Sequence, residues 1–121
     1  MLKKLIKKKI KKISFGNIKI KRDWGWAPEY MIGCNKILNS KNIEDYIIAT
    51  GRTISLEKLI YTCFKNYNLN WKNYVLIDKK KFRFSEIKEN HANTSKIKKY
   101  IKWTPNYKYL DVIKKLNNNE I

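Results

Sequence analysis

The run D-Y-I-I-A-T-G at residues 45–51 restricts the possible folds more than any other part of this chain. Its apolar centre is short, carries no charge and is stopped by a glycine, which is typical of a strand buried on both faces. The sequence therefore predicts a strand over residues 45–49. A strand of this type needs neighbouring strands and covering helices, so the run favours an α/β fold.

The surrounding pattern alternates helices with short extended pieces. Apolar spacing, capping residues and the prolines predict the following elements: an amphipathic helix over 1–12, extended pieces over 13–20 around a turn at 16–17, helices over 28–38, 55–67, 94–101 and 107–116, and a strand over 74–77. A complete doubly wound domain opens with a glycine-rich turn between strand and helix, and no G-x-G-x-x-G or G-x-x-G-x-x-G occurs here. The pattern therefore indicates the second half of a larger α/β unit.

The charge of the chain is strongly positive, with 28 Lys and Arg against 10 Asp and Glu, or +18 over 121 residues. A nucleic acid or another polyanion is one possible partner. The other explanation is compositional, because Lys, Ile and Asn share A- and T-rich codons and are all abundant (25, 18 and 14 residues). We favour the second explanation. Only three residues are Arg, and these are the first places to look for specific chemistry: Arg22, Arg52 and Arg83.

Two cysteines and one histidine give no metal-binding or disulfide pattern. Cys34 and Cys63 are widely spaced, and His91 is the single imidazole, so we predict two buried thiols, no metal site and no His-based acid–base group. No apolar run approaches the roughly 18 residues that a membrane span needs. We expect one domain, a cytoplasmic location and no membrane partner.

Four ordered motifs resemble those of the GDP-mannose 4,6-dehydratases, which are extended short-chain dehydrogenase/reductases acting on nucleotide sugars. G-N-I, K-R-D-W-G and E-Y at residues 16–30 resemble the family's G-N-L, R-D-W-G and D-Y. The family's D-Y-V-I-A-T-G, D-P-x-x-F-R-P-x-E and S-K…W-x-P have counterparts at residues 45–51, 78–86 and 95–105. The chain departs from the pattern at Phe84, Asn93 and Lys102, where the family usually has Pro, Asp and Gly.

The resemblance implies a fold class and a domain assignment. Residues 1–121 would form a single C-terminal, nucleotide-sugar-binding portion of a Rossmann-type extended dehydrogenase/reductase, with helices and a few short strands. The N-terminal dinucleotide-binding region, the catalytic Ser or Thr and the Y-x-x-x-K pair have no counterpart in this sequence. We therefore expect no catalytic residue and no NADP site in this chain, and we interpret it as a truncated or split gene product.

The resemblance also implies four substrate-binding residues. Arg22 and Arg83 match the arginines that hold the diphosphate, Glu86 matches the carboxylate that accepts hydrogen bonds from the ribose, and Asn17 lies in the turn beside the nucleotide. Planar guanidinium groups suit a diphosphate better than ammonium groups do. The alternative is structural: Arg22 would pair with Asp23, and Arg83 with Glu86. Arg52 matches no family ligand, and we interpret it as a solvated turn residue.

Two classes of function follow. The first is the GDP-mannose- or GDP-sugar-binding part of an enzyme that converts GDP-mannose to GDP-4-keto-6-deoxymannose. That enzyme would use NADP, would form a homo-oligomer when complete, and could receive its N-terminal half as a separate chain. The alternative is a small basic protein that binds nucleic acid or another polyanion on a remnant fold.

Overall fold

The structure is a computed structural model that describes residues 11–118. It is an α/β chain whose residues group into two compact units. Unit 1 comprises Met1–Lys21 and Ser55–Lys88, and unit 2 comprises Arg22–Ile54 and Glu89–Ile121. Each unit is therefore assembled from two separate stretches of the chain. The predicted helix over residues 1–12 lies almost wholly outside the described residues.

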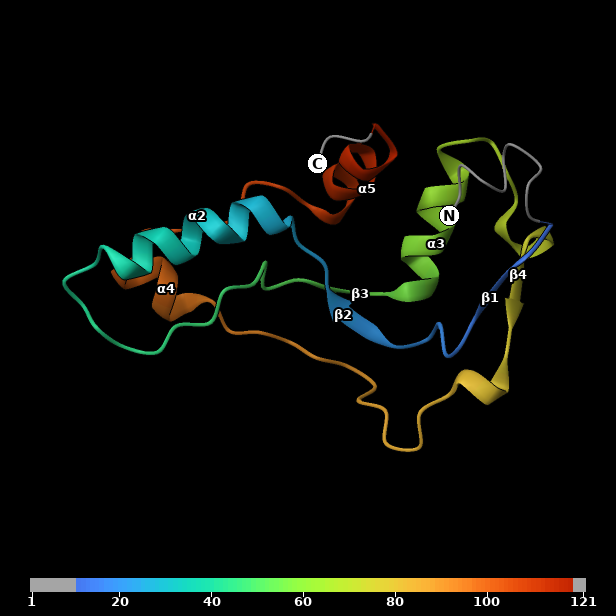
Figure 1. Ribbon diagram of the computed structural model, residues 1–121, viewed down its shortest axis with the longest axis horizontal. Coiled ribbons are helices and arrows are strands. Elements are labelled where there is room, and N and C mark those ends of the chain that lie inside the picture. The colour runs from blue at the N-terminus through green and yellow to red at the C-terminus, as the bar shows by residue number, and fades with distance from the viewer. Residues whose placement is uncertain (1–10, 119–121) are drawn as a thin grey trace. The chain divides into compact units, whose positions relative to one another are not determined.

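Unit 1 is a small β–α–β arrangement. Strand β1 (Ile13–Phe15) pairs in parallel with β4 (Val75–Ile77), with Ile13 opposite Val75. Helix α3 (Leu56–Lys65) lies between them in sequence and begins at Ser55, whose hydroxyl accepts a hydrogen bond from the Lys58 N–H at 3.1 Å. Figure 1 shows β1 and β4 side by side. The described part of the unit contains a buried hydrophobic cluster, which consists of Ile13, Ile18, Ile60, Phe64 and Val75.

Two short 3₁₀ elements flank β4 in the sequence. Element η1 (Trp71–Asn73) precedes β4, and η2 (Lys79–Lys81) follows it. The Asp78 side chain caps η2 by accepting a hydrogen bond from the Lys80 N–H at 3.0 Å. This cap turns the chain immediately before Arg83, which fixes the backbone that leads into the predicted substrate loop.

Unit 2 packs two of its helices around a tryptophan. Helix α2 (Ala27–Leu38) and helix α4 (Ser95–Tyr100) enclose a cluster centred on Trp103. The rings of Tyr30 and Trp103 meet edge to face, with centroids 6.1 Å apart. Helix α5 (Tyr109–Asn118) ends the described chain. Strands β2 (Lys21–Asp23) and β3 (Thr53–Ser55) pair with each other in a second two-stranded sheet.

Most of the predicted elements are confirmed, and the strand over residues 45–49 is wrong. That segment has no regular structure; Ala49 is buried, but Ile47 is 54% exposed. Tyr46 and Ile48 pack on the Trp103 cluster, so one face of the segment contacts the core of unit 2. A parallel strand also needs backbone partners at its edges, and the segment pairs with no strand of the described chain. Strands β2 and β3 were not predicted, because their pairing joins residues about 30 positions apart.

The two cysteines correct a further expectation. Both are free thiols, as predicted, but each is half-buried rather than buried. Burial raises the pKa of the Cys63 thiol, which makes it less nucleophilic at neutral pH. Within residues 11–118 no cluster of three potential metal-ligating side chains occurs, and no helix there is long and apolar enough to cross a membrane.

Candidate functional site

Asp23 of the R-D-W-G motif is the centre of a hydrogen-bond network in unit 2. Its Oδ1 accepts hydrogen bonds from the Thr50 N–H at 3.1 Å and the Thr50 hydroxyl at 2.7 Å. Its Oδ2 accepts one from the Arg52 N–H at 3.2 Å. Because one carboxylate meets three donors of the A-T-G-R segment, it fixes that turn against β2. The two motifs are thus parts of one local structure.

Tyr30 completes this network from helix α2. Its hydroxyl lies 3.4 Å from Asp23 Oδ1. Burial, together with the negative charge and hydrogen bond of Asp23, raises the pKa of Tyr30 to about 12. The ring also occupies the space in which a side chain at Gly25 would lie, since a Cβ there would overlap the Tyr30 phenol. The glycine of R-D-W-G is therefore required by the close approach of Tyr30.

Glu29 is the buried carboxylate of unit 2, only 5% exposed. Its Oε1 accepts a hydrogen bond from the Asn106 N–H at 2.5 Å, and its Oε2 accepts one from the Tyr107 N–H at 3.2 Å. A buried carboxylate is stable only when its oxygens are paired in this way. Glu29 of the E-Y pair therefore positions the segment that follows W-T-P and leads into α5.

Asn17, the first predicted substrate residue, lies in a turn at the end of β1. Its Oδ1 accepts a hydrogen bond from the Lys19 N–H at 2.9 Å, so the side chain stabilises its own turn. A Cβ at the neighbouring Gly16 would lie 2.8 Å from the Lys81 carbonyl oxygen. The turn thus packs directly against η2, and the glycine permits this approach. The Lys81 Nζ also donates to the Ser14 carbonyl at 3.2 Å.

Arg83 and Glu86 follow η2 in the same unit. Arg83 is exposed and Glu86 is half-buried. No ion pair joins the two among the residues that the structure describes, which removes one of the two structural alternatives. The structure therefore brings the Asn17 turn next to the segment that carries Arg83 and Glu86. Neither side chain is used for internal ion pairing.

Arg22 lies on β2 in unit 2 and is half-buried. The Asp23 carboxylate accepts hydrogen bonds from Thr50, Arg52 and Tyr30. The predicted local pairing of Arg22 with Asp23 did not include these contacts. Convergence of Arg22 and Arg83 on one diphosphate stays a prediction, because they belong to different units.

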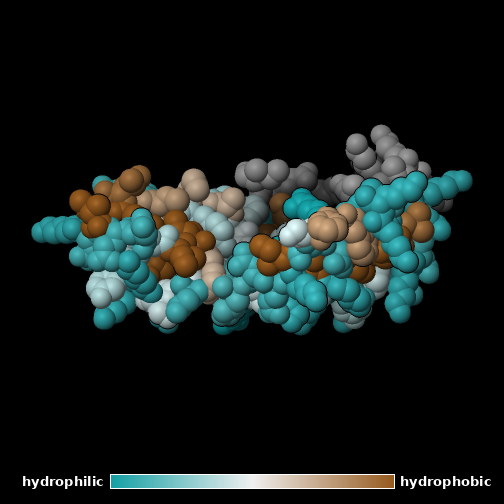
Figure 2. All heavy atoms as spheres, turned by 90° about the horizontal axis from the view of Figure 1, so that it is seen from below, coloured by the Kyte–Doolittle hydropathy of each residue, from teal (hydrophilic) through white to brown (hydrophobic). Residues whose placement is uncertain are grey.

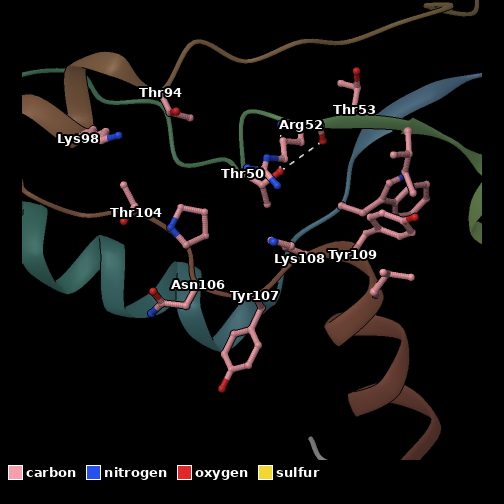
Figure 3. Close-up of a pocket in the computed structure, with 14 residues that line it drawn as sticks. Thr50, Arg52, Thr53, Thr94, Lys98, Thr104, Asn106, Tyr107, Lys108 and Tyr109 are labelled. Atoms are coloured by element: carbon pink, nitrogen blue, oxygen red, sulfur yellow. Dashed lines mark hydrogen bonds between the residues drawn. The ribbon is translucent and has the colours of Figure 1, made fainter.

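A pocket in unit 2 was not predicted from the sequence. It has a volume of about 550 Å³ and is lined by side chains from three separate segments and from Trp24. Figure 3 shows Arg52, Lys98 and Lys108 around it. Arg52 is exposed, as predicted, but it lines this pocket rather than an open turn. The A-T-G turn could have drawn attention to Arg52, whereas no sequence signal joins residues 50–54 to residues 104–110.

An apolar surface lies at the end of α2 and on the segment that follows it. Leu38 is 83% exposed, Ile43 is 94% exposed and Ile47 is 54% exposed, and these three residues are called the apolar patch below. Figure 2 shows hydrophobic atoms, in brown, exposed among hydrophilic atoms, in teal, on the face that it presents. Large apolar side chains that are exposed close together in sequence are candidates for contact with another chain or another part of the same protein.

Comparisons with known proteins agree with this arrangement. A family model described as "GDP-mannose 4,6 dehydratase" matches residues 1–116. GDP-mannose 4,6 dehydratase 2 of Arabidopsis thaliana is 30% identical over 110 residues, which cover 91% of this chain and 30% of the relative. The human GDP-mannose 4,6 dehydratase is 26% identical, with coverages of 89% and 34%. The chain thus spans about a third of the length of the curated relatives it matches.

Solved structures share the fold at lower identity. The ADP-L-glycero-D-manno-heptose-6-epimerase of Helicobacter pylori superposes with a TM-score of 0.78 at 13% identity, covering 96% of this chain and 34% of that one. RMD from Pseudomonas aeruginosa, solved with NADPH, gives a TM-score of 0.76 at 13% identity, covering 90% and 36%. The fold is therefore that of a fragment of the Rossmann-type extended dehydrogenase/reductases.

Proposed function

We propose that this chain, which belongs to the GDP-mannose 4,6 dehydratase family, is the C-terminal, nucleotide-sugar-binding part of such an enzyme. GDP-mannose or a related GDP-sugar is the proposed ligand. Asn17, Arg22, Arg83 and Glu86 are the proposed contacts. Dehydration at C5 and C6 of the hexose would need NADP and catalytic residues from another polypeptide segment.

The observation that carries this proposal is the packing of the Asn17 turn against η2. Gly16 approaches the Lys81 backbone closely, and Arg83 follows two residues later. Two motifs that are about 65 residues apart in sequence therefore pack against each other in unit 1. Arg83 supplies planar donors for a phosphate, and the half-buried Glu86 supplies acceptors for ribose hydroxyls. Unit 1 thus carries both polar functions that a nucleotide diphosphate requires.

The exposed apolar patch at Leu38, Ile43 and Ile47 supports the need for a further segment. The extended stretch around it packs one face on unit 2 and leaves the other face to solvent. A parallel sheet that supplied edge partners would convert this stretch into the strand that its sequence favours. We propose that an N-terminal, dinucleotide-binding half covers the patch and brings NADP to the substrate. Oligomerisation of that complete enzyme and its cytoplasmic location stay predictions.

The polyanion function remains the alternative, and the +18 charge is the observation in its favour. The two functions differ in how binding energy is distributed. A diphosphate site depends on a few groups in fixed geometry, whereas nucleic-acid binding is shared by many lysines and weakens steeply with salt.

Calorimetric titration of the purified chain with GDP-mannose, at low and at physiological salt, tests the proposal. Arg83→Lys should lower the affinity about tenfold, because an ammonium cannot replace the paired donors. Lys58→Ala, which removes an exposed charge from α3, is the matched control and should leave the affinity within about twofold. Equal small losses for both variants would contradict the proposal and favour the polyanion function.

Restoration of activity is the second test. The chain mixed with a separately produced N-terminal half of a family member should yield the 4-keto product from GDP-mannose and NADP. Ile47→Glu places a charge in the apolar patch and should prevent this complementation without changing the affinity of the chain for GDP-mannose. Turnover by the chain alone would overturn the domain assignment.

A further inference from the structure

The 550 Å³ pocket of unit 2 has features of a binding site that the proposed function does not use. Its volume is within the range of pockets that hold small metabolites. Its walls come from the turn after A-T-G, from helix α4 and from the segment that leads into α5. Glu29 and Asp23 hold two of these walls by hydrogen bonds to the backbone, so the pocket is positioned by buried structure rather than by loose surface loops.

The charges that line the pocket are all positive. Arg52, Lys98 and Lys108 contribute one cation each, from three different segments, and no carboxylate is among the lining residues. Three acidic groups lie nearby, but each already accepts a hydrogen bond: Asp23 from Thr50 and Arg52, Glu89 from the Thr53 hydroxyl, and Asp111 from the Lys108 N–H. No described carboxylate forms an ion pair with the side chains of the three cations.

Neutral donors accompany these cations. Hydroxyl groups of Thr50, Thr94 and Thr104 line the same space, and Figure 3 shows them on different sides of it. The Trp24 side chain lines the pocket as well, and its Nε1–H is buried with no hydrogen-bond partner in the described chain. Leaving a buried donor unpaired destabilises a protein, so such a group usually has a partner. An acceptor-rich ligand would supply one.

The remaining lining is apolar or aromatic. Ile54, Pro105, Leu110 and the tyrosines at 107 and 109 provide these surfaces. Cations and hydroxyls beside such a wall suit a ligand that has a phosphate at one end and a less polar body at the other.

We propose that this pocket is a second ligand site, which binds a small phosphorylated metabolite through Arg52, Lys98 and Lys108. The phosphate oxygens accept from these cations and from the threonine hydroxyls. The site is separate from the proposed GDP-sugar site, because its lining contains none of Asn17, Arg22, Arg83 and Glu86. The inference therefore does not depend on the proposed function.

The test is calorimetric titration of the purified chain with inorganic pyrophosphate and, in parallel, with ADP. Saturable binding of either ligand is expected. Arg52→Ala and Lys108→Ala should each weaken it about tenfold, as expected for loss of a charge-assisted hydrogen bond. Lys36→Ala on α2, an exposed lysine outside the pocket, is the control and should change the affinity by less than about twofold. Tighter binding of ADP than of pyrophosphate would identify a nucleotide, and the reverse order an inorganic or simple phosphate.

The indole N–H signals of a ¹⁵N-labelled sample give a second readout that does not depend on affinity. The signal that disappears in Trp24→Phe belongs to Trp24 and should shift on addition of pyrophosphate or ADP. The Trp71 signal, from unit 1, should not move. Absence of saturable binding, or equal losses for the Lys36 and Arg52 variants, would overturn the inference. Arg83→Ala separates the two proposals, because it should weaken GDP-mannose binding, whereas the pyrophosphate binding that Arg52→Ala and Lys108→Ala weaken should be unchanged.

Discussion

The carboxylate of Asp23 accepts hydrogen bonds from both the backbone N–H and the hydroxyl of Thr50, 27 residues further along the chain. This relationship joins the R-D-W-G and A-T-G motifs and determines where Arg52 lies. It also shows that Asp23 has a structural task that does not depend on bound substrate. The same carboxylate fixes one wall of the unit 2 pocket.

Asp23→Asn should destabilise the chain by about 1–3 kcal/mol, since an amide presents its NH₂ to backbone donors that need an acceptor. Urea unfolding followed by circular dichroism measures the change. Asp45→Asn, at an exposed position, is the matched control and should cost less than about 0.5 kcal/mol. Equal effects of the two substitutions would show that the Asp23 network contributes nothing specific.

Glu29→Gln tests the buried carboxylate in the same way. One of its two oxygens becomes a donor that faces a backbone N–H of residues 106–107, so we expect a loss of about 1–3 kcal/mol. Glu44→Gln removes an exposed ion pair with Lys96 and should cost at most about 1 kcal/mol. A Glu29→Gln protein as stable as the Glu44→Gln protein would contradict this account.

Gly33→Ala tests the packing of α2 on Trp103. Alanine favours a helix over glycine by about 1 kcal/mol. Its Cβ would, however, lie 2.9 Å from the buried Trp103 ring, and overpacking typically costs about 1–3 kcal/mol. We expect a net loss of stability in thermal unfolding. Lys36→Ala on the same helix has no such contact and should be neutral or slightly stabilising.

Alkaline pH should weaken unit 2 through Tyr30. Its pKa is raised from 10.0 to about 12, so the folded state favours the neutral phenol. This contribution is fully present below pH 10 and is lost as the pH rises towards 12. Tyr30→Phe cannot ionise, so its free energy of unfolding should fall less than that of the parent chain over this interval. Parallel curves for both proteins would show that Tyr30 ionisation is not coupled to folding.

The local elements could be predicted because short-range interactions dominate them. The Ser55 cap and the apolar spacing after it predict α3, and the spacing of Ile97 and Ile101 predicts the helix before Trp103. The ordered motifs also identify the family over most of the chain. These signals depend on residues three or four positions apart, or on a fixed order, and both are present in the sequence itself.

What only the tertiary structure decided depends on partners far away in the chain. Residues 45–49 have the composition of a strand but remain unpaired, because strand formation needs a neighbour's backbone groups and composition does not supply them. Asp23 accepts hydrogen bonds from a residue 27 positions away, and Glu29 from a residue 78 positions away. Arg52 and Lys108, which line the same pocket, are more than 50 positions apart. Such contacts form only when the whole core packs, so no local sequence pattern predicts them.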